Sequence, residues 1–321
     1  IGANSDTQAD DHFNTVLYTG NATARSITGV GFQPDWVWSK ARGLAQAHRL
    51  VDSSRGVQKS LYSNGTNAEA TESGLTAFNA DGFSIGTETS FNYNTEAFVA
   101  WNWKANGGTT SSNSDGSVTT TVQANTTSGF SIVLYTGTGA NATFGHGLGA
   151  VPKMIITKTR SHTGDWMVYH GANTSAPQTD FLKLNATNAT EDLNTVWNDT
   201  APTSSVFTLG SNGDVNTSGR TQVAYCFAEV EGYSKFGSYT GNDATDGTFV
   251  YTGFSPAYVI LKYSSGTAGG TKNWLLFDNK RDTSNPNDDT FNVNTADGET
   301  ADSNKDIDFL SNGFKLRNAE G

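Results

Sequence analysis

The tetrapeptide LYTG occupies residues 17–20 and returns at residues 134–137, and the variant SYTG occupies residues 238–241. The copies are about 104 to 118 residues apart, which is the length of a small domain. Recurrence at such a spacing predicts an internal repeat with three copies.

The similarity continues after each tetrapeptide. Each copy next has a turn containing glycine and proline, followed by a short apolar run that ends in lysine: GFQPDWVWSK, GLGAVPKMIITK and GFSPAYVILK. These runs are typical of strands, since a proline can begin a strand but removes a hydrogen bond from its middle. The aligned positions are Pro34, Pro152 and Pro256, and Lys40, Lys158 and Lys262.

The first two copies also end alike. NYNTEAFVAWNWKA at residues 92–105 matches NTSGRTQVAYCFAE at residues 216–229. Alternate positions put Val99, Trp101 and Trp103 on one face of a strand, and the second copy repeats that face. The third copy has no such ending in this sequence, so we expect its closing strand to be missing from this stretch of chain or to come from a neighbouring subunit.

The pattern of short apolar segments between glycine, asparagine, aspartate and proline is that of strands and turns. ADGF at residues 80–83 and SNGF at residues 311–314 predict tight hairpins in which both central residues have positive φ. The sequence therefore predicts an all-β chain of three tandem antiparallel β-sandwich repeats, jelly-roll or lectin-like, with the third incomplete.

Four segments follow from the repeat. We expect residues 1–105 to form the first sandwich with an N-terminal extension, and residues 106–129 to form a flexible linker with one possible strand. Residues 130–232 are expected to form the second sandwich, and residues 233–321 the third, without its closing strand.

The net charge of the chain indicates which kinds of partner it does not bind. The chain has 20 Lys and Arg against 31 Asp and Glu, a formal net charge of −11. With no basic stripe to neutralise phosphates, nucleic acid is not an expected partner. No apolar run approaches the length of a membrane span, so no membrane insertion is expected.

The motif Asp-x-x-Arg recurs in the first and third copies, as Asp52 with Arg55 and Asp278 with Arg281, whereas the second copy has His170 at the Asp position. A carboxylate beside a guanidinium can hold a sugar hydroxyl or a charged group, so these four residues are candidate ligand contacts. The alternative is a local ion pair that closes a turn. Recurrence favours the ion pair, because a repeated unit repeats its structural residues.

Two further groups are weaker candidates. Asp282, Asp288 and Asp289 cluster oxygen ligands of the kind that calcium accepts, although the spacing is not that of an EF-hand and a solvated loop is the alternative. Trp166 and Trp274 lie outside the strongest alternating segments and are candidates for stacking on a sugar.

The sequence offers no catalytic or cofactor-binding constellation. The five histidines are not at metal-ligand spacing, and no nucleophile elbow, P-loop or dinucleotide fingerprint occurs. The single cysteine, Cys226, lies in an alternating strand pattern and is expected to be a buried packing residue. We therefore expect a protein that is not an enzyme and has no cofactor, with calcium as the one open possibility.

The strings FVAWNWKA, SDGSVTTTVQANTTSGFSIVLYTG and VAYCFAEVEGYSKFGSYTGN resemble a repeat family of tail-fibre-like and other virion-associated proteins of bacteriophages, notably those of marine bacteria and cyanobacteria. The resemblance covers about residues 13–316. It implies a location on the virion surface or outside the cell, and contacts with other virion proteins and with further copies of this chain. It supplies no catalytic residues.

We therefore expect a non-enzymatic virion structural protein, a tail-fibre-like or surface-exposed fibre or decoration protein that serves host attachment or particle assembly. One alternative is a carbohydrate-binding adhesin module that recognises glycans on the host surface. Another is a subunit of a self-assembling extracellular filament.

Overall fold

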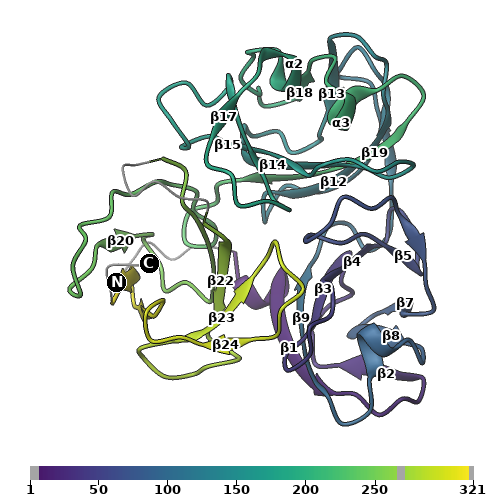
Figure 1. Cartoon of the computed structure of the whole chain (residues 1–321). Helices are drawn as coiled ribbons and strands as arrows, with labels where there is room; N and C mark the ends of the chain where they lie inside the picture. Colours follow the sequence, from purple (N-terminus) through teal and green to yellow (C-terminus); the bar gives the residue numbers. More distant parts are fainter. Residues whose placement is uncertain (1–6, 266–271, 318–321) are drawn as a thin grey trace.

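The structure is a computed structural model that describes residues 7–265 and 272–317. It is all-β with antiparallel sheets, as the sequence predicts. Figure 1 shows three lobes arranged around a common centre, one lobe for each sequence repeat.

The first unit combines a main sheet of order β1-β9-β3-β4 with a smaller sheet of order β2-β8-β7. A third, two-stranded sheet pairs β5 with β6. The elements are η1 (Ala9–Asp11), β1 (Phe13–Thr19), β2 (Arg25–Thr28), β3 (Trp36–Ala41), β4 (Arg49–Asp52), β5 (Lys59–Ser60), β6 (Ala70–Thr71), β7 (Leu75–Asn79), β8 (Gly82–Ile85), α1 (Thr89–Asn92) and β9 (Ala97–Trp103).

The second unit has an eight-stranded sheet of order β10-β11-β12-β19-β14-β15-β16-β17, faced by the pair β13-β18. The elements are β10 (Ser111–Asn113), β11 (Thr120–Asn125), β12 (Phe130–Thr136), β13 (Ala142–Gly145), β14 (Pro152–Thr159), β15 (Met167–His170), β16 (Asp180–Lys183), β17 (Glu191–Asp192), α2 (Asn194–Trp197), β18 (Val206–Leu209), α3 (Gly213–Asn216) and β19 (Thr221–Ala228).

The third unit has a main sheet of order β21-β22-β23-β24 and a smaller sheet of order β20-β26-β25. The elements are β20 (Phe249–Tyr251), β21 (Tyr258–Lys262), β22 (Trp274–Asp278), β23 (Asp289–Asn292), β24 (Thr300–Ala301), β25 (Ile307–Leu310) and β26 (Gly313–Leu316).

Each unit is a two-layer sandwich, and in the first two units the central strands of the main sheet are buried on both faces. Strand β9 shows how the alternation achieves this, because Val99 and Trp101 point to one core and Ala100 points to another. The second core lies between the main and small sheets of the same unit. The second and third units have equivalent cores of their own.

The other face of every main sheet packs into one core that all three units share, at the centre of Figure 1. This shared core replaces the rod-like series of separate sandwiches that tandem repeats suggest. Its buried members come from all three units and include Trp36, Trp38, Val99, Trp101, Phe130, Ile132, Trp166, Tyr225, Trp274, Leu276 and Phe291.

The repeated tyrosine of the opening tetrapeptide points inward in each unit, toward the unit's own core. Tyr18 donates its hydroxyl to the carbonyl of Phe91 at 2.9 Å, and Tyr135 makes the same bond to Val215 at 2.9 Å. The tetrapeptide therefore marks a structural strand that is tied to the short helix before the closing strand.

The two hairpins predicted from ADGF and SNGF are present, but their turns differ from the prediction. Asn79 pairs with Gly82 and Leu310 pairs with Gly313, so each glycine belongs to the returning strand and not to the turn centre. Gly82 has φ 126°, and an added Cβ would lie 2.1 Å from the carbonyl oxygen of Ile27. Close approach of a neighbouring strand therefore requires this glycine.

The segment expected to be a flexible linker is structured. Strand β11 pairs with β12 inside the main sheet of the second unit, which confirms the possible strand. The glycine-rich part is held by Asp35, whose carboxylate accepts backbone N–H groups of Gly107 and Gly108 at 2.9 and 2.7 Å. Cys226 is fully buried in the core of the second unit, as expected.

Candidate functional site

The Asp-x-x-Arg motif of the first unit lies where the chain turns after β4. Both side chains are fully buried, and Arg55 donates through Nε to Asp52 Oδ2. The backbone N–H of Arg55 donates to Asp52 Oδ1 at 2.8 Å, which closes the turn. Burial by itself lowers the pKa of Arg55, but the adjacent Asp52 carboxylate outweighs burial and raises it.

The third unit repeats this geometry after β22. Arg281 Nε lies 2.6 Å from Asp278 Oδ2, and the Arg281 backbone N–H donates to Asp278 Oδ1 at 2.9 Å. These side chains are also fully buried. The local ion pair expected from the sequence is therefore present in both units, inside the protein and not at its surface.

Each of these aspartates also accepts a hydrogen bond from a neighbouring unit. The Tyr225 hydroxyl donates to Asp52 Oδ2 at 2.7 Å, and Trp101 Nε1 donates to Asp278 Oδ2 at 3.0 Å. Tyr225 and Trp101 occupy equivalent positions in β19 and β9. Because groups within the chain occupy the carboxylates, the prediction that Asp52, Arg55, Asp278 and Arg281 contact a ligand is not supported by their positions.

In the first and third units, a glutamate links the arginine of the motif to a second arginine from a neighbouring unit. Glu69 Oε2 accepts from Arg55 Nη1 at 3.0 Å and from Arg160 Nε of the second unit at 2.9 Å. The corresponding residues of the third unit are Glu299 with Arg281 at 2.7 Å and with Arg42 at 3.0 Å. Sequence reasoning missed this network, although Arg42 and Arg160 each follow the repeated lysine by two residues.

The second unit lacks this charge network. His170 stands in the aspartate position, and its Nδ1 accepts the backbone N–H of Ala172 at 3.3 Å. Burial lowers the pKa of His170, so the imidazole is neutral at pH 7. With Nδ1 as an acceptor, the proton of the neutral ring is on Nε2.

Trp166 and Trp274 are buried and have no ring face exposed to a sugar, at 0% and 3% exposure. Their indole N–H groups donate to carbonyls of the preceding unit, from Trp166 to Tyr62 at 2.7 Å and from Trp274 to Lys183 at 2.9 Å. This corrects the prediction that they contact a ligand. The first unit has His48 at this position, where its Nε2 lies 3.2 Å from the carbonyl oxygen of Asn292.

Two of the repeated lysines also join the units. Lys158 Nζ donates to Thr66 of the first unit at 3.0 Å, and Lys262 Nζ donates to Thr187 of the second at 2.9 Å. Lys40 is fully buried, and its Nζ donates to the carbonyls of Ala41 and Leu44 in its own unit at 2.8 and 3.0 Å. Burial lowers the pKa of Lys158 to about 8, although Asp214 and Asp165 oppose the shift.

This shift predicts a pH dependence of stability. An unfolded lysine keeps its proton to about pH 10.4, whereas folded Lys158 releases it near pH 8, so the unfolded state binds more protons between these values. The cost of burying the charge is therefore present below pH 8 and is relieved as pH rises toward 10.4. We expect the free energy of unfolding of wild type to gain about 1–2 kcal/mol relative to Lys158→Met between about pH 7.5 and pH 9.5.

Urea denaturation at both pH values measures this difference. Lys153→Met is the matched control, because Lys153 is exposed on the same strand. Parallel pH profiles for wild type and Lys158→Met would contradict the prediction.

The calcium candidates do not converge. Asp282 Oδ1 accepts from the Ser284 hydroxyl at 2.8 Å, while Asp289 turns to Arg42, with Oδ2 and Nη2 3.4 Å apart. In the part of the chain that the structure describes, no three His, Cys, Asp or Glu side chains gather as a metal site. Asp288 contributes its backbone N–H to Asp282 Oδ2 at 3.3 Å.

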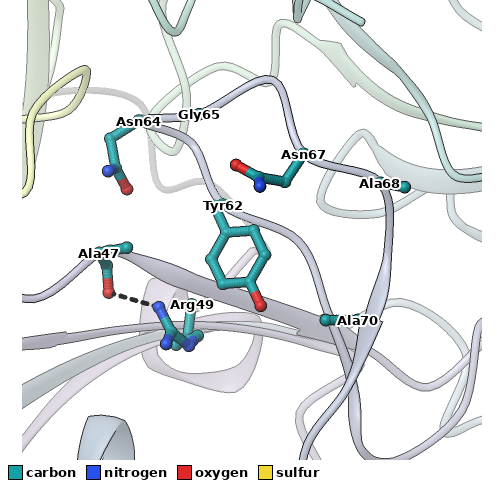
Figure 2. A pocket seen from close by; sticks show the side chains of 8 residues that line it. All are labelled: Ala47, Arg49, Tyr62, Asn64, Gly65, Asn67, Ala68 and Ala70. Carbon is teal, nitrogen blue, oxygen red and sulfur yellow. Dashed lines mark hydrogen bonds between the residues drawn. The ribbon is translucent and has the colours of Figure 1, made fainter. Parts of the chain in front are cut away.

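A shallow polar pocket lies on the first unit, between β4 and the loop before β6 (Figure 2). Arg49 lies over the ring of Tyr62, with 4.6 Å between the guanidinium carbon and the ring centre. Both side chains bond to Glu72, and the Arg49 Nη1 group donates to the carbonyl of Ala47 at 3.0 Å. Its remaining lining residues are Asn64, Gly65, Asn67, Ala68 and Ala70.

None of the helices among the described residues has the length and apolar character of a membrane span.

The family model of a domain of unknown function, DUF7483, matches residues 8–321. The chain belongs to the DUF7483 family. The match spans all three units around the shared core. Curated proteins and solved structures give no match to this DUF7483 chain.

Proposed function

We propose that the chain is a non-enzymatic structural protein of a bacteriophage particle, a tail-fibre-like or surface fibre or decoration protein that serves host attachment or assembly. The virion part of the proposal rests on the resemblance of the repeated strings. The structural part rests on one observation: the polar residues that recur between units, such as Asp52, Arg55 and Tyr225, bond to one another inside the protein.

A rigid body of this kind suits a virion surface. The shared core and the ion pairs of Glu69 with Arg160 and of Glu299 with Arg42 join the units, while polar loops face outward. On the proposal, those loops contact other virion proteins, further copies of this chain or the host surface.

Quantitative mass spectrometry of purified particles from the source of this sequence tests the proposal. We expect a constant number of copies per particle, retained through density-gradient purification and high salt. A capsid protein and a phage protein that is not packaged serve as the two controls. Loss of the chain during purification, to the level of the unpackaged protein, would overturn the proposal.

A carbohydrate-binding adhesin is the second candidate, and the pocket in Figure 2 favours it. Asn67 is exposed and makes no hydrogen bond among the described residues, while Tyr62 and Asn64 line the same hollow. A free amide binds sugar hydroxyls, and an aromatic ring beside it stacks on a sugar ring.

A glycan array with purified protein tests this second candidate. We expect binding to a surface polysaccharide that Asn67→Ala weakens about tenfold, because that change removes one free amide without disturbing the fold. Asn94→Ala, at an exposed position far along the chain, is the control. Equal binding by the two variants, or none by wild type, would exclude the pocket as a glycan site.

A further inference from the structure

In the first two units, the closing strand lies in the middle of the main sheet. Strand β9 pairs with β1 on one side and β3 on the other, and β19 pairs in the same way with β12 and β14. The central aromatic residue of each, Trp101 or Tyr225, points into the shared core. These two strands bury every residue of β3 and all but one residue of β14.

The third unit has no strand in this position among residues 7–265 and 272–317. Strand β21, which corresponds to β3, pairs with β22 alone. Val259 is its one buried residue, whereas Tyr258, Ile260, Leu261 and Lys262 are all partly exposed. An apolar strand is thus left at a sheet edge, where natural proteins seldom leave one uncovered.

The free edge has hydrogen-bonding groups ready for a partner. The carbonyl of Ala257 accepts from Asn279 N–H at 3.1 Å and so points toward β22. Because the direction alternates along a strand, the backbone groups of Tyr258, Ile260 and Lys262 point the other way. In β3 and β14 the equivalent residues face β9 and β19.

The glycine that ends each copy of the repeated tetrapeptide also contacts the segment before the closing strand in the first two units. A Cβ on Gly20 would lie 2.0 Å from the carbonyl oxygen of Tyr93, and one on Gly137 would lie 2.2 Å from that of Thr217. Both contacts are with the residue that leads into the closing strand. The third glycine, Gly241, has no described atom within 4 Å of such a Cβ, and the preceding segment forms no strand.

We propose that the edge of β21 is an acceptor site for a β-strand that has the closing-strand pattern of this chain. The strand pairs antiparallel with β21 and places an aliphatic residue and two aromatic residues, at alternate positions, against the shared core. Val99, Trp101 and Trp103 do this in the first unit. The inference is independent of the proposed virion role, because it follows from the internal repeat alone.

The site also selects the central residue of the strand. Tyr225 of the second unit donates to Asp52 of the first, and Trp101 of the first unit donates to Asp278 of the third. A closing strand in the third unit would meet His170 of the second unit in the equivalent place. His170 uses Nδ1 as an acceptor and presents an N–H at Nε2, so it requires an acceptor opposite. A tyrosine hydroxyl accepts a hydrogen bond and an indole does not, and the site therefore prefers tyrosine to tryptophan.

A peptide that copies residues 216–229 tests the site on the full chain, with binding followed by fluorescence anisotropy. We expect saturable binding at one peptide per chain. Replacing Val223, Tyr225 and Phe227 of the peptide by serine should weaken binding by at least about tenfold. The single change Tyr225→Trp in the peptide should weaken it by a smaller factor.

A fusion supplies the strand within the chain. A copy of residues 215–229 placed directly after Gly321 puts its asparagine seven residues beyond Leu316, as Asn216 is seven beyond Leu209. We expect the melting temperature to rise by about 5 °C and peptide binding to disappear. The same fusion with the three serines is the control and should change neither.

Three results would overturn the inference. One is absence of peptide binding together with an unchanged melting temperature in the fusion. Another is equal binding of the original and triple-serine peptides. The last is a dimer in sedimentation equilibrium to which the peptide does not bind, because a second copy would then occupy the β21 edge.

Discussion

Asp52→Ala is expected to lower the free energy of unfolding by about 3–5 kcal/mol, because it leaves a buried guanidinium without its principal counter-charge. Asp52 and Arg55 are both fully buried, and Asp52 also accepts the Tyr225 hydroxyl of the next unit. The variant therefore leaves three buried donors without their acceptor: Arg55 Nε, the Arg55 backbone N–H and the Tyr225 hydroxyl. Glu69 remains near Arg55 Nη1 but cannot replace the contact at Nε.

Urea denaturation followed by tryptophan fluorescence measures this loss. Asp192→Ala is the matched control, since Asp192 is exposed at the end of a sheet, and it should change stability by less than about 0.5 kcal/mol. Tyr225→Phe removes one of the three hydrogen bonds that Asp52 accepts and should cost about 1 kcal/mol. If Asp52→Ala behaves like the control, the Asp–Arg pair does not stabilise the fold.

Most of the strands were predictable, because residues that share a face recur at every second position along them. The alternation in VAWNWK placed Val99, Trp101 and Trp103 on one face, and that face lies in the shared core. The opposite face is buried too, through Phe98 and Ala100. A strand buried on both faces does not reveal which core each face joins. The sequence therefore predicted sandwiches correctly and their arrangement around a common centre not at all.

The polar contacts were less predictable, because their partners are distant in sequence. Asp52 and Arg55 are three residues apart and were recognised as a pair, but Tyr225 lies 173 residues away. Spacing gives no information on burial, so the sequence predicted a local ion pair at a turn but not its position inside the protein. His48 aligns with Trp166, and only the structure shows that both rings reach a carbonyl of another unit.

The residues predicted to contact a ligand were chosen for their chemical groups, and in the structure those groups have structural roles. Trp166 and Trp274 were set apart because they lie outside the clearest alternation, yet each begins or precedes a strand that lines the shared core. The acidic residues near Asp282 satisfy turn hydrogen bonds. Local sequence cannot separate such structural uses from binding, because both favour the same residue types.

Trp36→Ala is the second change with a large expected effect, again a loss of about 3–5 kcal/mol in the free energy of unfolding. Trp36 is 1% exposed, and its ring stacks on that of Tyr225 from the second unit at 4.3 Å. It also contacts Trp103 of its own unit at 4.5 Å. The cavity opens where two units meet, so both lose packing.

The number of thermal unfolding transitions is as informative as the melting temperature. Because residues of all three units make up the shared core, no unit can unfold without exposing the others, and unfolding should remain a single transition in Trp36→Ala. Differential scanning calorimetry with Tyr251→Ala as the control, an aromatic residue that is 65% exposed, measures both effects. Two separate transitions, with only one shifted by the substitution, would mean that the units fold independently and that the central contacts contribute little to holding them together.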